Sequence, residues 1–130
     1  MFKKRQESPS GKFLNFELIK QENGIFFFEI IFPPETASPL NLVQGGMIDA
    51  ALDEATSMTA YIAFKEEKLP LTTDHHVLFH RPMPLGKATM QTKIIKYGKT
   101  VTTIEGKLFD QNERLVATML HTALPTIIPN

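Results

Sequence analysis

The chain has 130 residues, of which 42% are hydrophobic, 14 are basic, 14 are acidic and none is cysteine. This length and apolar content suit one globular domain and exclude a chain that is disordered in bulk. The lack of cysteine excludes disulfides, thiolate catalysis, cysteine-based zinc sites and iron–sulfur clusters, and it fits a reducing compartment. A net charge of zero argues against a general nucleic-acid binder.

No apolar run approaches the roughly 20 residues needed to cross a bilayer. The basic start, residues 1–7, lacks the apolar stretch of a signal peptide. We therefore expect a cytoplasmic protein with no membrane partner. Charge is nevertheless uneven, because residues 17–67 hold nine acidic and two basic side chains and residues 81–107 hold six basic and one acidic. This pattern reflects either ordinary solvation of exposed strands or a basic surface for an anionic ligand.

The first half of the chain predicts a tail and a β-hairpin. Residues 1–12 are expected to form a flexible tail, and residues 13–130 to form a single domain. Residues 13–20 alternate in polarity, and residues 25–32 are the most strand-like run of the chain. Asn23-Gly24 between them predicts a two-residue turn, because both positions tolerate positive φ.

A long helix is expected over residues 47–64, which contain strong helix formers and neither proline nor glycine. Its apolar residues lie almost all round, which is typical of a helix buried on most faces. Four further strands are predicted after it, at residues 72–81, 87–97, 99–109 and 113–124. The simplest α+β arrangement is a helix packed on an antiparallel sheet of five to six strands, and a sheet that wraps the helix would bury it all round.

Gly45 and Gly46 lie where this helix is expected to begin. Glycine allows close approach to the unpaired N–H groups of a helix start, where the helix dipole adds positive potential. Such a place suits a carbonyl oxygen that becomes negative in a transition state. The alternative is a loop that needs glycine only for its backbone angles.

Acidic residues inside the apolar helix are the second unusual feature. Asp49, Asp53 and Ser57 are spaced by four and share one stripe, and Glu54 is turned about 100° from Asp53. A carboxylate on a buried helix must be paired, be neutral or face a cavity, so Asp53 is a functional candidate. The alternative is a solvent or interface stripe in which Asp49 also caps the positive helix end.

The histidines do not predict a metal site. Asp74, His76 and His80 alternate onto one face of a strand, but His76 and His80 would lie about 13 Å apart at a rise of roughly 3.4 Å per residue. One ion cannot reach both at ligand distances near 2 Å. His75 is expected on the opposite face, and His121 is expected to be a strand residue with a satisfied hydrogen bond.

The helix segment, residues 41–55 (NLVQGGMIDAALDEA), resembles the hotdog-fold acyl-CoA thioesterases, in particular the phenylacetate-pathway type. The resemblance covers about residues 25–124 and implies a long helix wrapped by an antiparallel sheet. Further matching pieces follow in the same order, namely Leu71-Thr72-Thr73-Asp74, Phe79-His80-Arg81-Pro82, Tyr97-Gly98-Lys99 and Leu115-Val116-Ala117-Thr118.

The resemblance implies a thioester hydrolase in which Asp53 activates water or attacks directly. The backbone N–H of Gly45 would polarise the thioester carbonyl, helped by Gln44, which stands where the family often has histidine. Thr72, the hydroxyl expected from a partner subunit, or Ser57 would position the water. Gln44 can donate a hydrogen bond but cannot transfer a proton.

The resemblance also implies that the site forms between two subunits, in a homodimer or homotetramer, and needs neither metal nor cofactor. Candidate contacts to the coenzyme A thioester come from the loop before the helix and from the basic segment. Ser38 stands where the family has asparagine. The candidate substrate-binding residues are Ser38, Asn41, Gly46, Arg81, Lys96 and Lys99.

Two other functions stay open at this point. One is a non-catalytic acyl-CoA-binding or regulatory hotdog protein, which the loss of the family's histidine and asparagine at Gln44 and Ser38 favours. The other is a hotdog hydratase or dehydratase, but the chain lacks the paired acid–histidine loop pattern of those enzymes.

Overall fold

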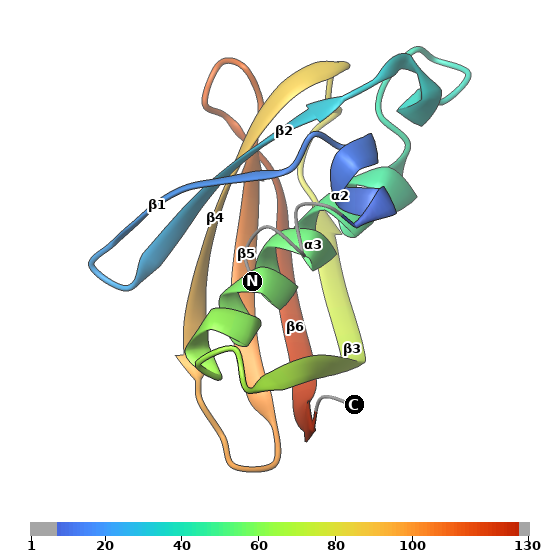
Figure 1. Cartoon of the computed structure of the whole chain (residues 1–130). Helices are drawn as coiled ribbons and strands as arrows, with labels where there is room; N and C mark the ends of the chain where they lie inside the picture. The colour runs from blue at the N-terminus through green and yellow to red at the C-terminus, as the bar shows by residue number, and fades with distance from the viewer. Residues whose placement is uncertain (1–7, 128–130) are drawn as a thin grey trace.

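The computed structural model describes residues 8–127, which form one antiparallel sheet around one long helix (Figure 1). No helix among these residues is long and apolar enough to span a membrane. The elements in chain order are α2 (Pro9–Phe13), β1 (Glu17–Glu22), β2 (Ile25–Phe32), the 3-10 helix η1 (Pro34–Thr36), α3 (Gly45–Ala63), β3 (Lys68–Phe79), β4 (Gly86–Lys96), β5 (Thr102–Phe109) and β6 (Leu115–Ile127).

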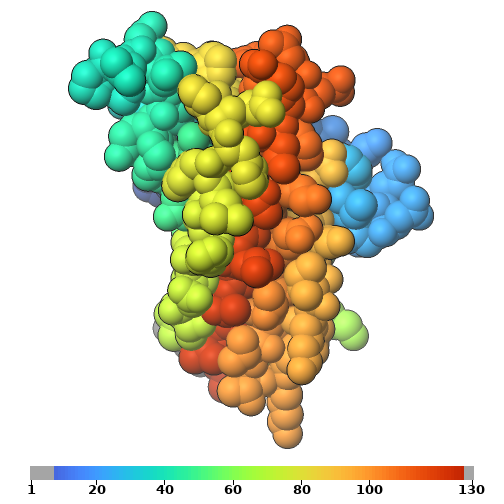
Figure 2. Space-filling view, turned by 180° about the vertical axis from the view of Figure 1, so that it is seen from behind, coloured from blue at the N-terminus to red at the C-terminus, as the bar shows by residue number. Residues whose placement is uncertain are grey.

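The six strands are ordered β1-β2-β4-β5-β6-β3, so β3 leaves the helix and crosses to the far edge of the sheet. In Figure 1 the sheet curves around α3, which lies diagonally across its concave face. From behind, Figure 2 shows the outer face, with β3 beside β6 at one edge. The expected wrapping of a central helix by an antiparallel sheet is confirmed.

The predicted hairpin forms at the predicted turn. Asn23 and Gly24 have φ values of 53° and 79°, and the strands on either side pair with each other. Along β2, alternate residues are buried, which places Phe28 and Ile30 in the core. The hairpin follows from local sequence because turn chemistry and the alternation of polarity agree.

Part of the predicted tail is wrong. Residues 9–12 belong to helix α2, where Ser8 caps the helix by accepting a hydrogen bond from the N–H of Gly11. Ser10 donates a hydrogen bond to the buried carboxylate of Glu54 on α3. This contact gives Glu54 a packing role, and the remaining residues of the expected tail, 1–7, lie outside the described part of the chain.

Helix α3 starts two residues before the predicted start and is buried over most of its length. Gln44 caps it, with its side-chain oxygen accepting a hydrogen bond from the N–H of Met47. The core-facing residues include Ala51, Leu52 and Ala55, each with no exposed surface. Their small and apolar side chains let the helix pack closely on the sheet.

The turn between β5 and β6 is held by Asp110, which is buried. Its carboxylate accepts hydrogen bonds from the N–H groups of Asn112 and Arg114 and from the Arg114 guanidinium. The backbone N–H of Arg114 is the main cause of a lowered pKa for Asp110, and burial opposes it. A carboxylate whose pKa is depressed by folding stabilises the fold above its unfolded pKa, near 4, and loses this contribution as the pH falls through its folded pKa.

Replacement Asp110→Asn is therefore expected to lower the thermal midpoint at pH 7, with a difference from wild type that narrows below about pH 4. Thermal unfolding followed by circular dichroism across this range measures it. Glu113→Gln is the matched control, because it removes an exposed acid from the same turn. A midpoint difference for Asp110→Asn that stays constant with pH would contradict the assignment.

Candidate active site

The predicted stripe is present on α3, and its acidic residues lie on one side of the helix. Ser57 donates a hydrogen bond to Oδ1 of Asp53 at 3.0 Å, one helical turn away. The Asp49 and Asp53 side chains are 41% and 42% exposed, whereas most of their helix is buried. Asp53 thus keeps solvent access while one of its oxygens is held in place.

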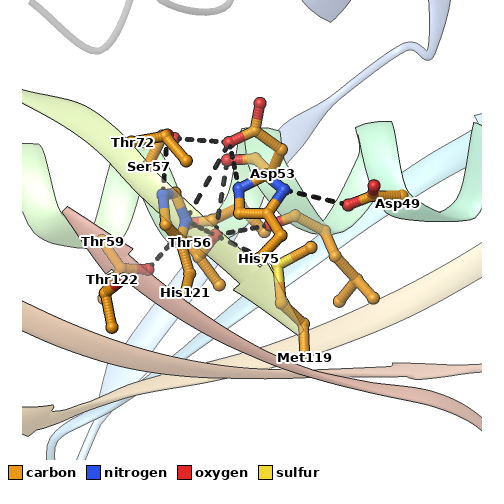
Figure 3. A network of polar contacts seen from close by, with 12 residues as sticks. Asp49, Asp53, Thr56, Ser57, Thr59, Thr72, His75, Met119, His121 and Thr122 are labelled. Carbon is orange, nitrogen blue, oxygen red and sulfur yellow. Dashed lines mark hydrogen bonds and ion pairs between the residues drawn. The ribbon is translucent and has the colours of Figure 1, made fainter. Parts of the chain in front are cut away.

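An imidazole from the neighbouring strand lies between the two carboxylates. His75 of β3 places Nδ1 3.1 Å from Oδ1 of Asp49 and Nε2 3.3 Å from Oδ1 of Asp53. These two contacts, drawn as dashed lines in Figure 3, connect β3 to two successive turns of α3. The sequence places His75 opposite His76, but its partners on the helix were not predicted.

A β-bulge brings Thr72 onto the same side of the sheet as His75. Thr72 pairs with Ala123 and Asp74 pairs with Thr122, so Thr73 is an extra residue in β3. His75 pairs with His121, which shares a face with Ala123 because they are two apart in β6. Without the extra residue, Thr72 and His75 would lie on opposite faces, and nothing in the local sequence indicates the bulge.

His121 lies at the centre of the cluster with no exposed surface. Its Nδ1 is 2.7 Å from Oγ1 of Thr56, and its Nε2 is 2.8 Å from Oγ1 of Thr72. Its ring meets that of His75 edge to face, with centroids 4.3 Å apart (Figure 3). The expectation of a strand histidine with satisfied hydrogen bonds is confirmed.

Asp53, His75 and His121 each place one possible metal-ligating atom within 4.8 Å of the other two. The sequence did not predict this group. Nδ1 of His121, the ring nitrogen nearer to Asp53, is already at hydrogen-bond distance from Thr56. A metal there would have to displace that hydroxyl.

The start of α3 offers a backbone donor. Gly45 is the first helical residue, so its N–H has no partner within the helix, and none among the described residues. Gly45 also lines a surface hollow of about 330 Å³, together with Phe79 and Arg81. A Cβ at Gly46 would lie 2.9 Å from Oε1 of Gln44, so glycine there lets the capping side chain fold back.

The two candidate groups on α3 are far apart within one chain. Gly45 and Asp53 are eight residues apart, which at the helical rise of 1.5 Å is about 12 Å. In a thioester, the carbonyl oxygen that would bind Gly45 and the carbonyl carbon that would be attacked near Asp53 are directly bonded atoms. A thioester carbonyl held by the Gly45 N–H is therefore too far from the Asp53 carboxylate of the same chain for direct contact between them.

The other predicted contact residues are dispersed. Ser38 and Asn41 shape the loop before α3, since Ser38 accepts hydrogen bonds from Leu40 and Asn41, and Asn41 has a φ of 59°. Lys96 ends β4 and Lys99 follows in the next loop, where neighbouring Tyr97 packs on Phe64 just after α3. That is the opposite end of α3 from Gly45, so the structure does not bring these lysines to the hollow of the same chain.

Comparison with known proteins identifies the family. A sequence profile of the Thioesterase superfamily matches residues 40–117. A protein of Saccharolobus solfataricus named "Putative esterase" is 28% identical over 106 residues, which cover 82% of this chain and 75% of that protein.

Solved structures agree with this match. A phenylacetic acid degradation-related protein from Ralstonia eutropha is 25% identical, with a TM-score of 0.83 over 92% of this chain and 94% of its own. A Streptococcus mutans protein bound to acetyl CoA has the same fold, at 16% identity and a TM-score of 0.78 over 91% and 94% of the two chains. The chain therefore belongs to the thioesterase superfamily and has the hotdog fold that residues 41–55 indicated.

Proposed function

We propose that the protein hydrolyses acyl-CoA thioesters and that Asp53 is the group that activates the water. One observation carries the proposal: a solvent-accessible carboxylate lies on a mostly buried helix that begins with a backbone N–H that has no partner among the described residues. Family membership supplies the reaction class, thioester hydrolysis. We propose in addition that the substrate is an acyl-CoA and that each residue has the role described below.

Gly45 is the proposed oxyanion donor. Its N–H has no partner among the described residues and lies at the positive end of the helix dipole. A donor of this kind stabilises the charge that develops on the carbonyl oxygen as water attacks. Gln44 uses its side-chain oxygen for the helix cap. Its amide N–H₂ therefore remains to donate a second hydrogen bond to the carbonyl oxygen of the thioester.

Asp53 is the proposed general base, with direct attack to give an anhydride as the alternative route. Ser57 donates to Oδ1, so Oδ2 remains for the water. Thr72 is the proposed second contact to the water. All groups belong to the protein chain, so this mechanism uses no metal or cofactor.

Two copies of the chain are needed to complete such a site. Because Gly45 and Asp53 of one chain are about 12 Å apart along α3, we propose that Gly45 and Gln44 come from one copy and Asp53, Ser57 and Thr72 from the other. The edge strand β3 is the proposed contact, since among the described strands it pairs with β6 alone and it exposes Leu71 and Leu78 by 56% and 53%.

Coenzyme A is the proposed carrier of the acyl group. The acetyl CoA bound to the Streptococcus mutans protein supports a ligand of this class for the same fold. Arg81 lines the hollow beside Gly45, and its Nε donates to the carbonyl of Leu115, which leaves the outer guanidinium nitrogens for a phosphate. Lys96 and Lys99 are proposed phosphate contacts from the partner copy.

The separating experiment is a thiol-release assay on wild-type protein with short, aromatic and long acyl-CoA substrates, together with calorimetric binding of the same compounds. Release of coenzyme A supports hydrolysis, and the preferred acyl chain then defines the substrate. Tight binding without turnover would replace the proposal by a non-catalytic acyl-CoA-binding protein, for which Gln44 in place of a proton-transferring histidine is the favouring feature.

Replacement Leu78→Lys on β3 is expected to convert the assembly to monomers and to abolish hydrolysis. Because Leu78 is half exposed in the single chain, the charge costs the subunit fold little, while it blocks an edge contact. Size-exclusion chromatography with light scattering measures the state, and the thiol-release assay measures activity. Ile19→Lys on β1, at the opposite edge, is the control. A fully active monomer would contradict the two-copy site.

A further inference from the structure

The histidine at the centre of the cluster has no part in the proposed mechanism, although it is a completely buried polar side chain. His121 contacts the hydroxyl of Thr56 through Nδ1 and that of Thr72 through Nε2. Thr56 is itself fully buried on α3, whereas Thr72 is exposed on β3. The imidazole therefore links the helix core to a surface hydroxyl beside Asp53.

The partners of Thr56 determine which ring nitrogen carries the hydrogen. Oγ1 of Thr56 is 2.8 Å from the carbonyl oxygen of Leu52 and 2.7 Å from Nδ1 of His121. The carbonyl can only accept, so the hydroxyl hydrogen of Thr56 points to Leu52. Both contacts are hydrogen bonds only when Nδ1 of His121 carries a hydrogen and donates it to Thr56.

This tautomer sets the direction of the next hydrogen bond. In a neutral imidazole with hydrogen on Nδ1, Nε2 is an acceptor. Thr72 must then donate its hydroxyl hydrogen inward to Nε2, at 2.8 Å. The lone pairs of Thr72 Oγ1 remain for a donor on its exposed side, and a water molecule is such a donor.

We infer that His121 is a positioning residue that holds the Thr72 hydroxyl as a hydrogen-bond acceptor for the attacking water. The inference rests on the proposed thioester hydrolysis and adds a group that acts through Thr72. Water then has two fixed acceptors, Thr72 and Asp53, both next to His121, whose Nδ1 lies 3.9 Å from Oδ1 of Asp53.

The reaction balances with these groups. The water oxygen bonds to the thioester carbon, one water proton passes to Asp53, and the other stays on oxygen, directed at Thr72 until the acid forms. The carbon–sulfur bond breaks with its electron pair on sulfur, which then takes the proton that Asp53 received. His121 neither gains nor loses a proton in this sequence, so its contribution is orientation.

The tautomer is tested without any substrate. Long-range proton–nitrogen correlation spectra of nitrogen-labelled protein, assigned with His121→Asn as the reference, report which ring nitrogen carries hydrogen. The expected result is hydrogen on Nδ1 only. Hydrogen on Nε2 of His121 would overturn the inference, because Thr72 could then no longer donate to it.

The catalytic consequence is tested with a matched pair of amides. The amide of glutamine reaches the position of Nε2, whereas that of asparagine reaches only the position of Nδ1. His121→Gln is expected to keep kcat close to wild type, because its side-chain oxygen can accept from Thr72. His121→Asn keeps the contact with Thr56 and loses the contact with Thr72. It is expected to lower kcat between about 3- and 10-fold, the usual effect of losing one neutral hydrogen bond, with little change in KM.

A double-mutant cycle separates positioning from general damage. In a Thr72→Val background the hydroxyl is absent, so His121→Asn is expected to cause no further loss of kcat. An equal loss in both backgrounds would overturn the inference and leave the proposed function intact, provided that wild type hydrolyses acyl-CoA and Asp53→Asn does not. Absence of hydrolysis in wild type would overturn both the proposed function and the role of Thr72.

Discussion

Replacement Asp53→Asn is expected to lower kcat for thioester hydrolysis between about one-hundredfold and ten-thousandfold, the usual contribution of a general base. Asparagine has nearly the same shape and can still accept the hydrogen bond from Ser57, so the helix is retained. It cannot take a proton from water or form an anhydride. Thiol release under saturating acyl-CoA measures kcat, and KM is expected to change little.

Asp49→Asn is the matched control for this variant. Asp49 lies one turn earlier on the same stripe, has almost the same exposure as Asp53 and contacts the same imidazole, His75. It lies outside the proposed contacts to water, so a loss of less than tenfold is expected. Full activity in Asp53→Asn, or equal losses in both variants, would remove Asp53 from the proposed role.

Replacement Gly45→Pro is expected to lower kcat between about one-hundredfold and one-thousandfold, the usual effect of removing one oxyanion donor. Proline removes the backbone N–H and is well tolerated as the first helical residue. The preceding residue, Gln44, already has the extended backbone that proline requires, with a ψ of 140°. Thermal unfolding and thiol release, measured on the same sample, separate lost stability from lost catalysis.

Gly45→Ala is the control, because alanine keeps the N–H while adding a Cβ 3.5 Å from the Phe79 ring, an ordinary contact. It is expected to retain most of the activity. Equal losses for alanine and proline would show that the Cβ, and not the missing donor, is responsible, and would contradict the oxyanion assignment.

Mixing the two inactive variants extends the test to the assembly. When Gly45→Pro and Asp53→Asn chains associate at random, half of the dimers are mixed, and each mixed dimer has one intact site and one doubly altered site. About one quarter of the wild-type activity should return. No recovery, with mixed dimers demonstrated by mass spectrometry, would mean that Gly45 and Asp53 of the same chain serve one site.

Local sequence was sufficient where one short-range effect dominates. Asn23-Gly24 and the alternating apolar residues of β2 define the hairpin, and the spacing of Asp49, Asp53 and Ser57 places them on one stripe of α3. These features depend only on turn stereochemistry and on the periods of strand and helix. The same reasoning missed α2, although Ser8-Pro9 is a helix-start signal, because its five residues are too few to show periodicity.

The residues around Asp53 depend on pairing between distant segments. His75 and Thr72 reach the same face only because β3 carries an extra residue where it pairs with β6, and His121 comes from that second strand. A bulge is decided by how two strands fit each other, so neither strand reveals it alone.

Residues close together in the chain were sufficient to predict the long helix, the approximate positions of the six strands, the family, and the acidic stripe with its glycine start. The contacts of His75 with Asp49 and Asp53, and of His121 with Thr72, arise only when the strands pack on the helix. Strand register and the distances between side chains are properties of the packed chain, so no short segment specifies them.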